Sequence, residues 1–151
     1  MLDVKQFRSL VVDPALKAVD MYSEAASRLL VGTALVESNL TYLKQIKGPA
    51  LGLFQMEPAT YHDHVTWLLA SPSRRHIAEL LNPLRPEKLI WDLQFAAILC
   101  RVHYLRVPAP LPAADDIDGL AQYWKDHYNT RRGKGRPEEF VRRYREFGGG
   151  H

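Results

Sequence analysis

The sequence predicts a mainly α-helical fold, and two observations support this prediction. Apolar residues recur at helical spacing in most of the stretches between prolines, and no stretch shows a convincing alternation of apolar and polar residues. The chain has 151 residues, of which 46% are hydrophobic and 25% are charged, as in ordinary globular domains. We therefore expect one domain over residues 1–147, with at most a small irregular β element, and a flexible tail over residues 148–151.

The first strong helix is expected over residues 23–38. Ser23 suits the N-cap position, and Glu24 is favourable beside the helix N-terminus. One stripe of this helix consists of residues at helical spacing, namely Ala26, Leu30, Thr33 and Glu37. A carboxyl group is thus expected at the end of a buried helix face.

The following segments are expected to alternate between loops and helices. Residues 44–55 should form an irregular loop, because two glycines and a proline fall within five positions. Helices are expected over residues 58–69 and 73–81, the first opened by a proline whose fixed φ suits that position. A long, largely buried helix is expected over residues 86–106, and a stiff proline-rich connector over residues 108–112.

The last part of the chain should contain two helices. Apolar residues at helical spacing predict an amphipathic helix over residues 116–128, and Pro137 is expected to open the final helix. Positive charge concentrates in this part of the chain, whose formal net charge is +3 overall. The basic residues are Arg131, Arg132, Lys134, Arg136, Arg142, Arg143 and Arg145. They form either a solvated helix face or a patch for a polyanion such as nucleic acid or a cell-wall polymer.

Several classes of protein are excluded by composition. Cys100 is the only cysteine, so neither an intrachain disulfide nor a zinc site made of cysteines can form. The most apolar stretches, residues 29–36 and 93–100, are much shorter than the ~20 residues that a membrane span needs. The N-terminal residues lack the apolar core of a secretory signal, which predicts synthesis in the cytosol.

Glu37 is the main candidate for acid–base chemistry. A carboxyl group on an apolar helix stripe loses hydration on folding, which raises its pKa and permits it to act as a general acid near neutral pH. The alternative is an exposed or Arg-paired glutamate at a frayed helix end.

Two further segments are candidates for ligand binding. In residues 48–55, the glycines permit close approach of the backbone, Phe54 offers a stacking surface and Gln55 offers an amide for sugar groups. The alternative is an ordinary Gly–Pro turn. Tyr128 and Asn129 end an amphipathic helix, where the tyrosine could equally belong to the core and Asn129 could equally act as a C-cap.

Together these segments resemble the superfamily of lytic transglycosylases and goose-type lysozymes, which cleave peptidoglycan. The specific part of the resemblance is Glu37-Ser38, followed by Gly52-Leu53-Phe54-Gln55 and then by Pro58-Ala59-Thr60. Weaker matches lie in residues 95–105 and 127–133. The chain departs from the pattern at Phe54, where the family usually carries Met, at Glu57, and in the last motif, which lacks an Ala-Gly pair.

The resemblance implies a lysozyme-like fold and cleavage of the β-1,4 bond between N-acetylmuramic acid and N-acetylglucosamine. Glu37 would protonate the glycosidic oxygen, and would then act as a base if the muramic 6-hydroxyl attacks to form a 1,6-anhydro product. The resemblance implies no metal and no cofactor. It assigns substrate contacts to Ser38, Gln55, Tyr128 and Asn129, with Tyr128 orienting Glu37, and Phe54 joins them as the stacking surface.

Hydrolysis and transglycosylation both remain open, and the family analogy favours the second. An inverting hydrolase would need another carboxylate about 6.5–9.5 Å from the first to activate water. The candidates are Glu57, which could instead be an N-cap residue, and Asp63, which is expected on an exposed helix face. His62 and His64 are not expected to bind a metal, because positions i and i+2 of a helix point apart.

The sequence resembles those of small proteins encoded by tailed bacteriophages. This implies peptidoglycan glycan strands and phage tail or baseplate proteins as partners, with no specific nucleic acid and no membrane span. Made without a signal peptide, the protein would be carried in the virion or released to the host periplasm and cell wall. One alternative is a non-catalytic structural or adaptor protein of the virion with a lysozyme-like fold. The other is nucleic-acid binding through the basic run, which carries no helix-turn-helix or zinc signature.

Overall fold

The computed structural model describes residues 1–129 and 133–148, and it is mainly helical, as the sequence predicts. In chain order the elements are α1 (Val4–Phe7), η1 (Arg8–Val12), α2 (Asp13–Ala18), α3 (Glu24–Ser38), α4 (Pro58–Leu69), α5 (Pro72–Leu81), α6 (Lys88–Trp91), α7 (Leu93–Leu105), α8 (Ile117–His127), α9 (Pro137–Arg143) and η2 (Tyr144–Gly148), where η1 and η2 are π-helical turns. Within the described residues, β-type pairing is limited to two isolated bridges, Lys44 with Leu51 and Leu51 with Met56. Both lie between α3 and α4, in the predicted loop over residues 44–55 and directly after it.

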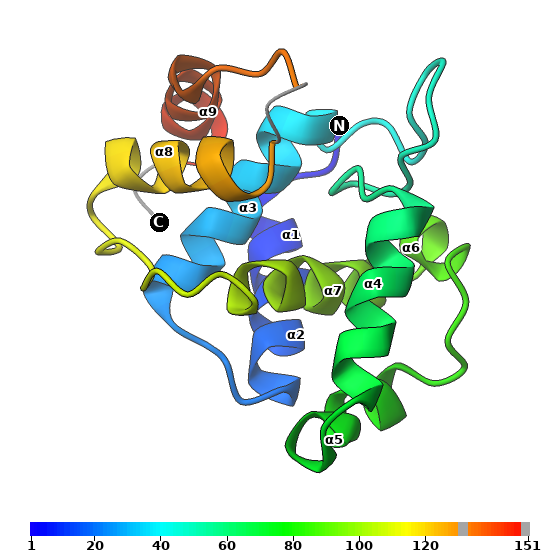
Figure 1. The fold of residues 1–151 in the computed structure, drawn as a ribbon. Helices are drawn as coiled ribbons and strands as arrows, with labels where there is room; N and C mark the ends of the chain where they lie inside the picture. The colour runs from blue at the N-terminus through cyan, green and yellow to red at the C-terminus, as the bar shows by residue number, and fades with distance from the viewer. Residues whose placement is uncertain (130–132, 149–151) are drawn as a thin grey trace.

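The central element is α3, which packs against α2, α7, α8 and α9 (Figure 1). The Ser23 hydroxyl accepts a hydrogen bond of 3.0 Å from the backbone N–H of Ala26, so Ser23 is the predicted N-cap. At the other end, Asn39 adopts a left-handed conformation (φ 53°) and donates its backbone N–H to Leu35. The predicted stripe of apolar residues is buried, and Glu37 lies in the last helical turn.

The N-terminal segment is helical, which was not expected from the sequence. A proline tends to break or to start an element, because it lacks a backbone N–H, and Pro14 lies in the first turn of α2. The structure accommodates it through η1, where the N–H of Asp13 donates to the carbonyl of Arg8, five residues earlier. The resulting run from α1 to α2 buries Phe7, Val12 and Leu16.

The expected single helix over residues 86–106 is wrong, because the chain breaks at Asp92 into α6 and α7. Asp92 has an extended backbone (φ −100°, ψ 94°), and its carboxylate accepts a hydrogen bond of 3.1 Å from the N–H of Phe95. The aspartate therefore acts as an N-cap inside an apolar stretch. The predicted helix over residues 73–81 also begins one residue earlier, at Pro72.

The C-terminal part follows the prediction closely. Asp116 caps α8 by accepting a hydrogen bond of 2.9 Å from the N–H of Gly119, and the connector over residues 108–112 contains no helix. Gly148, expected in the tail, belongs to η2, and the other predicted tail residues, 149–151, lie outside the described residues. Arg131 and Arg132 of the basic run also lie outside them.

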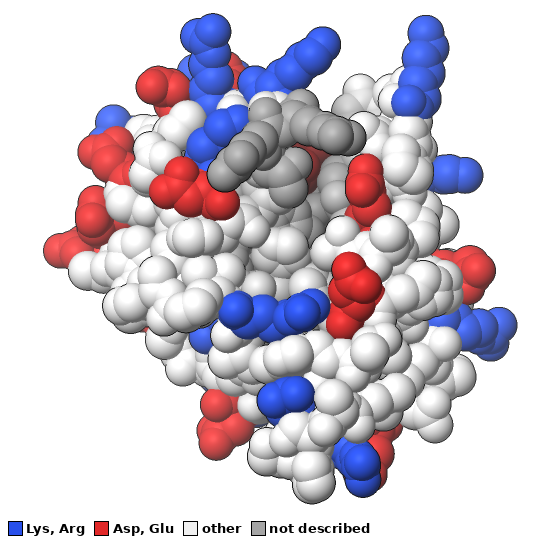
Figure 2. Space-filling model, in the orientation of Figure 1, with Lys and Arg blue, Asp and Glu red and all other residues white. Residues whose placement is uncertain are grey.

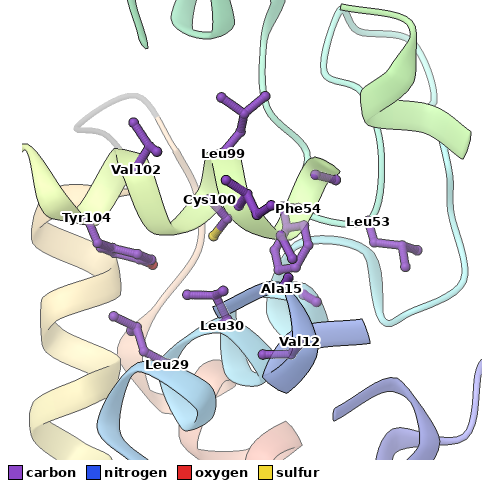
Figure 3. Close-up of a cluster of buried hydrophobic side chains, with 14 of the residues drawn as sticks. Val12, Ala15, Leu29, Leu30, Leu53, Phe54, Leu99, Cys100, Val102 and Tyr104 are labelled. Atoms are coloured by element: carbon purple, nitrogen blue, oxygen red, sulfur yellow. The ribbon is translucent and has the colours of Figure 1, made fainter. Parts of the chain in front are cut away.

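One hydrophobic core joins α2, α3 and α7 (Figure 3). The loop after α3 contributes Leu53 and Phe54 to this core, where they lie with Val12, Leu30 and Cys100. In the part of the chain that the structure describes, no helix combines the length and hydrophobicity required to cross a membrane.

Candidate active site

A cleft of about 510 Å³ opens at the C-terminal end of α3. Its walls come from α3, the loop that follows it, α4, α7 and the end of α8. Figure 2 shows this face of the molecule, with acidic side chains on the side of α4. The described residues that line the cleft and carry polar or ionisable side chains are Glu37, Tyr42, Gln45, Gln55, Glu57, Thr60, His103, Tyr128 and Asn129.

Glu37 lies in the wall of this cleft, in the last turn of α3. Burial raises its pKa from 4.5 to about 7, because the charged form loses hydration. Hydrogen bonds from Trp124 and Asn129 and the positive charge of Lys125 act in the opposite direction and stabilise the carboxylate. The expectation of a desolvated carboxyl group is thus confirmed, and among the described residues the alternative of an exposed or Arg-paired glutamate does not hold.

Trp124 orients Glu37, and the sequence did not identify it as a site residue. Its indole Nε1–H donates a hydrogen bond of 2.9 Å to Oε2 of Glu37, although the side chain is only 1% exposed. A Cβ atom at Gly135 would come within 2.5 Å of the indole ring, so a glycine is required there. The available signal was a tryptophan on the same helical face as Tyr128, one turn earlier.

The amide of Asn129 is oriented by Lys125. The ammonium group of Lys125 donates to Oδ1 of Asn129 (2.9 Å) and to the carbonyl of Gly133 (3.0 Å). Because Oδ1 is engaged as an acceptor, the amide nitrogen is the group that donates to Glu37. The predicted placement of Asn129 at the site agrees with this geometry.

Tyr128 lines the cleft, but it does not orient Glu37 as the resemblance implied. Its hydroxyl donates a hydrogen bond of 2.6 Å to the backbone carbonyl of Phe54. This bond fastens the end of α8 to the loop that follows α3. Burial raises the pKa of the Tyr128 hydroxyl well above its ordinary value, so it remains a donor at neutral pH.

Two predicted substrate contacts are wrong, because the side chains are buried away from the cleft. The Ser38 hydroxyl is 3% exposed and donates a hydrogen bond of 2.6 Å to the carbonyl of Leu53. Phe54 is 2% exposed and lies in the hydrophobic core (Figure 3), and the centre of its ring is 6.1 Å from that of Phe7. Both residues hold the loop against the core instead of contacting a ligand.

Gln55 does line the cleft, as predicted. Its backbone is left-handed (φ 51°), which is a strained conformation for a residue with a side chain, and its amide Nε2 donates to the carbonyl of Gly52 (2.9 Å). Gly52 is also left-handed (φ 79°), and a side chain there would collide with the backbone carbonyl of Leu89. The glycine therefore permits approach to α6, and not to a ligand as expected.

The two candidates for a second carboxylate occupy different positions. Glu57 is exposed and lines the cleft, and its side chain makes no capping hydrogen bond at the start of α4. Asp63 is exposed on α4 and does not line the cleft. Among the described residues that line the cleft, Glu37 and Glu57 are the two that carry carboxyl groups.

His64 and His103 form a hydrogen-bonded pair that the sequence did not indicate. The His64 Nε2 atom is 2.9 Å from Nδ1 of His103, and His103 lines the cleft. Burial lowers the pKa of His64 to about 3 and lowers that of His103, so both rings are neutral near pH 7. His62 is exposed, whereas His64 is buried, in agreement with the expectation that the two point apart.

Comparisons with protein-family models, with curated proteins and with solved structures found no match. The function is therefore argued from the chemistry of the cleft. The decisive feature is a partly buried carboxyl group that titrates near neutral pH and faces two fixed hydrogen-bond donors.

Proposed function

We propose that the protein has a lysozyme-like fold and cleaves peptidoglycan, using Glu37 as a general acid and then as a general base. The observation that supports this most strongly is the pKa of about 7 at Glu37 in the wall of a cleft. A carboxyl group with this pKa is substantially present in both protonation states near neutral pH, which suits proton transfer in both directions.

In the first step the neutral carboxyl group of Glu37 donates its proton to the glycosidic oxygen. The bond between this oxygen and C1 of N-acetylmuramic acid breaks through an oxocarbenium-like transition state. The carboxylate that remains on Glu37 accepts hydrogen bonds from the indole of Trp124 and the amide of Asn129. These donors are fixed before the reaction, so they stabilise the developing charge without reorganisation.

In the second step the nucleophile that attacks C1 gives up a proton, which the Glu37 carboxylate accepts in the intramolecular route. If the muramic 6-hydroxyl attacks C1, the product is a 1,6-anhydro sugar and one carboxylate suffices. If water attacks, Glu57 is the described cleft residue with a second carboxylate to activate it. We favour the intramolecular route, because Glu57 is exposed and its side chain makes no capping hydrogen bond at the start of α4.

The test is digestion of purified Gram-negative peptidoglycan by the wild type and by Glu37→Gln, Glu57→Gln and Asp63→Asn, with mass spectrometry of the released muropeptides. We expect wild-type products that are lighter than hydrolysis products by one water per new end. Glu37→Gln should release none, and Asp63→Asn, an exposed carboxylate outside the cleft, should behave like the wild type. Reducing ends together with an inactive Glu57→Gln variant would instead identify a muramidase.

A folded wild type that releases nothing would contradict the proposal. It would support the other reading of the sequence, a non-catalytic structural or adaptor protein of a phage virion. From the sequence resemblance we propose that glycan strands and phage tail or baseplate proteins are the partners in either case.

A further inference from the structure

A continuous chain of hydrogen bonds links α7, α4 and α8 beside the cleft. Nη1 of Arg106 is 3.1 Å from Nδ1 of His64, and Nε2 of His64 is 2.9 Å from Nδ1 of His103. Nε2 of His103 is in turn 2.7 Å from the backbone carbonyl oxygen of His127. The chain therefore ends at the last residue of α8.

The direction of this chain follows from the chemistry of its first member. A guanidinium group can only donate, so Nδ1 of His64 accepts and its Nε2 carries the hydrogen. The same argument makes Nδ1 of His103 an acceptor and Nε2–H the donor to the carbonyl of His127. Both rings are neutral, and each nitrogen has one defined role.

Two members of this chain of hydrogen bonds, Arg106 and His103, also make aromatic contacts. The guanidinium group of Arg106 lies 5.5 Å from the centre of the Trp67 ring. The guanidinium group of Arg74 lies 4.0 Å from the centre of the same ring. The ring of His103 packs against that of Tyr128, with 4.6 Å between their centres. His64 itself is only 3% exposed.

The bond to His127 is placed where it can control the site. A helix leaves its last carbonyl groups without partners inside the helix, and His103 supplies one here. The next two residues are Tyr128, whose hydroxyl binds the carbonyl of Phe54, and Asn129, whose amide donates to Glu37. A shift at the end of α8 would therefore move Asn129 relative to Glu37.

We propose that His103 is a positioning residue for Glu37. His103 holds the end of α8 through the carbonyl of His127, so that the amide of Asn129 reaches the carboxyl group of Glu37. His64 and Arg106 fix the tautomer of His103 that makes this bond. The catalytic meaning of this role depends on the proposed function, but the geometry does not.

The experiment compares His103→Asn with His103→Gln and follows the titration of the Glu37 carboxyl group by ¹³C NMR without substrate. The asparagine amide lies near the position of Nδ1 and cannot reach His127, whereas the longer glutamine amide can place a donor near the position of Nε2. Both replacements are neutral, as His103 is. The charge of Lys125 beside Glu37 is unchanged in both variants, so a shift reports a change in the burial of Glu37 or in its hydrogen bonds from Asn129 and Trp124 at the end of α8.

We expect His103→Asn to raise the pKa of Glu37 above 7 by about one pH unit, because a hydrogen bond to the charged form is lost. His103→Gln should restore most of the wild-type value. The same titration in both folded variants as in the wild type would overturn the proposal.

A measurement on the wild type decides the question if neither variant folds. The ¹⁵N spectrum of the histidine rings should show the Nε2–H tautomer at both His64 and His103 at pH 7. A protonated His103, or its Nδ1–H tautomer, would overturn the proposal. Because none of these measurements uses peptidoglycan, a protein that shows the predicted shifts but cleaves nothing would refute the proposed function alone.

Discussion

Replacing Glu37 by Gln should stabilise the protein at alkaline pH and much less at acidic pH. The wild-type carboxyl group has a pKa of about 7 in the folded protein, against 4.5 as its ordinary value. A raised pKa means that the folded state binds the proton more tightly than the unfolded state does. The stability associated with this proton is present below pH 4.5 and is lost as the pH rises through 7.

The magnitude follows from the two pKa values. Their difference corresponds to about 3.4 kcal/mol when the titration is complete, of which roughly 2.5 kcal/mol is lost between pH 5 and pH 8. Glutamine does not titrate, so Glu37→Gln should lose none of this. The glutamine side chain retains one oxygen for the hydrogen bond from Trp124, but it leaves the amide donor of Asn129 less well satisfied. This cost in stability is the same at pH 5 and at pH 8.

The assay is urea denaturation followed by circular dichroism at pH 5 and pH 8, for the wild type, Glu37→Gln and Glu57→Gln. The free energy of unfolding of Glu37→Gln relative to the wild type should increase by roughly 2.5 kcal/mol from pH 5 to pH 8. Glu57→Gln removes an exposed carboxylate of the same cleft and is the matched control. A relative stability of Glu37→Gln that does not change with pH would refute the reasoning.

Three further predictions address the surroundings of the site. Trp124→Phe keeps an aromatic ring but removes the indole donor, so the pKa of Glu37 should rise by about one pH unit; an unchanged ¹³C titration would show that this hydrogen bond does not act on the carboxyl group. Gly52→Ala places a Cβ atom against a backbone carbonyl at positive φ, and it should lower the free energy of unfolding by about 2–4 kcal/mol in urea denaturation, whereas a loss below about 1 kcal/mol would contradict the close packing. Burial lowers the pKa of His64 to about 3, so the stability that the neutral ring contributes is present above pH 6.5 and is lost as the pH falls. The free energy of unfolding of the wild type should decrease by roughly 2–3 kcal/mol by pH 4.5 on this account. His64→Gln should not show this decrease, whereas His62→Gln on the same helix should show it in full.

The helices were predictable where a local signal and the packing agree. Ser23 and Asp116 are capping residues that precede apolar stripes, and both helices begin directly after them. Asp92 is also a capping residue, but it lies within an apolar stretch, so the hydrophobic pattern concealed the break between α6 and α7. Pro14 lies in the first turn of α2, directly after η1, in a segment for which the sequence predicted no element.

The candidate site was predictable in part. Helical spacing placed Glu37 at the end of a buried stripe, and the structure confirms both its partial burial and its raised pKa. Phe54 and Ser38 were misassigned because the loop folds back onto the core, which depends on tertiary contacts that no local pattern records. Trp124 is buried and His103 is half-buried, and both were missed because the role of each depends on one hydrogen bond across the fold.

The most direct test of the account compares the pH dependence of cleavage with the titration of Glu37 in the same protein. If Glu37 is the acid, kcat/KM for peptidoglycan should fall as the pH rises through about 7, with the same midpoint as the ¹³C titration of its carboxyl group. Trp124→Phe should move both midpoints upward together. A rate that stays constant between pH 6 and pH 9 while Glu37 loses its proton would contradict the central claim.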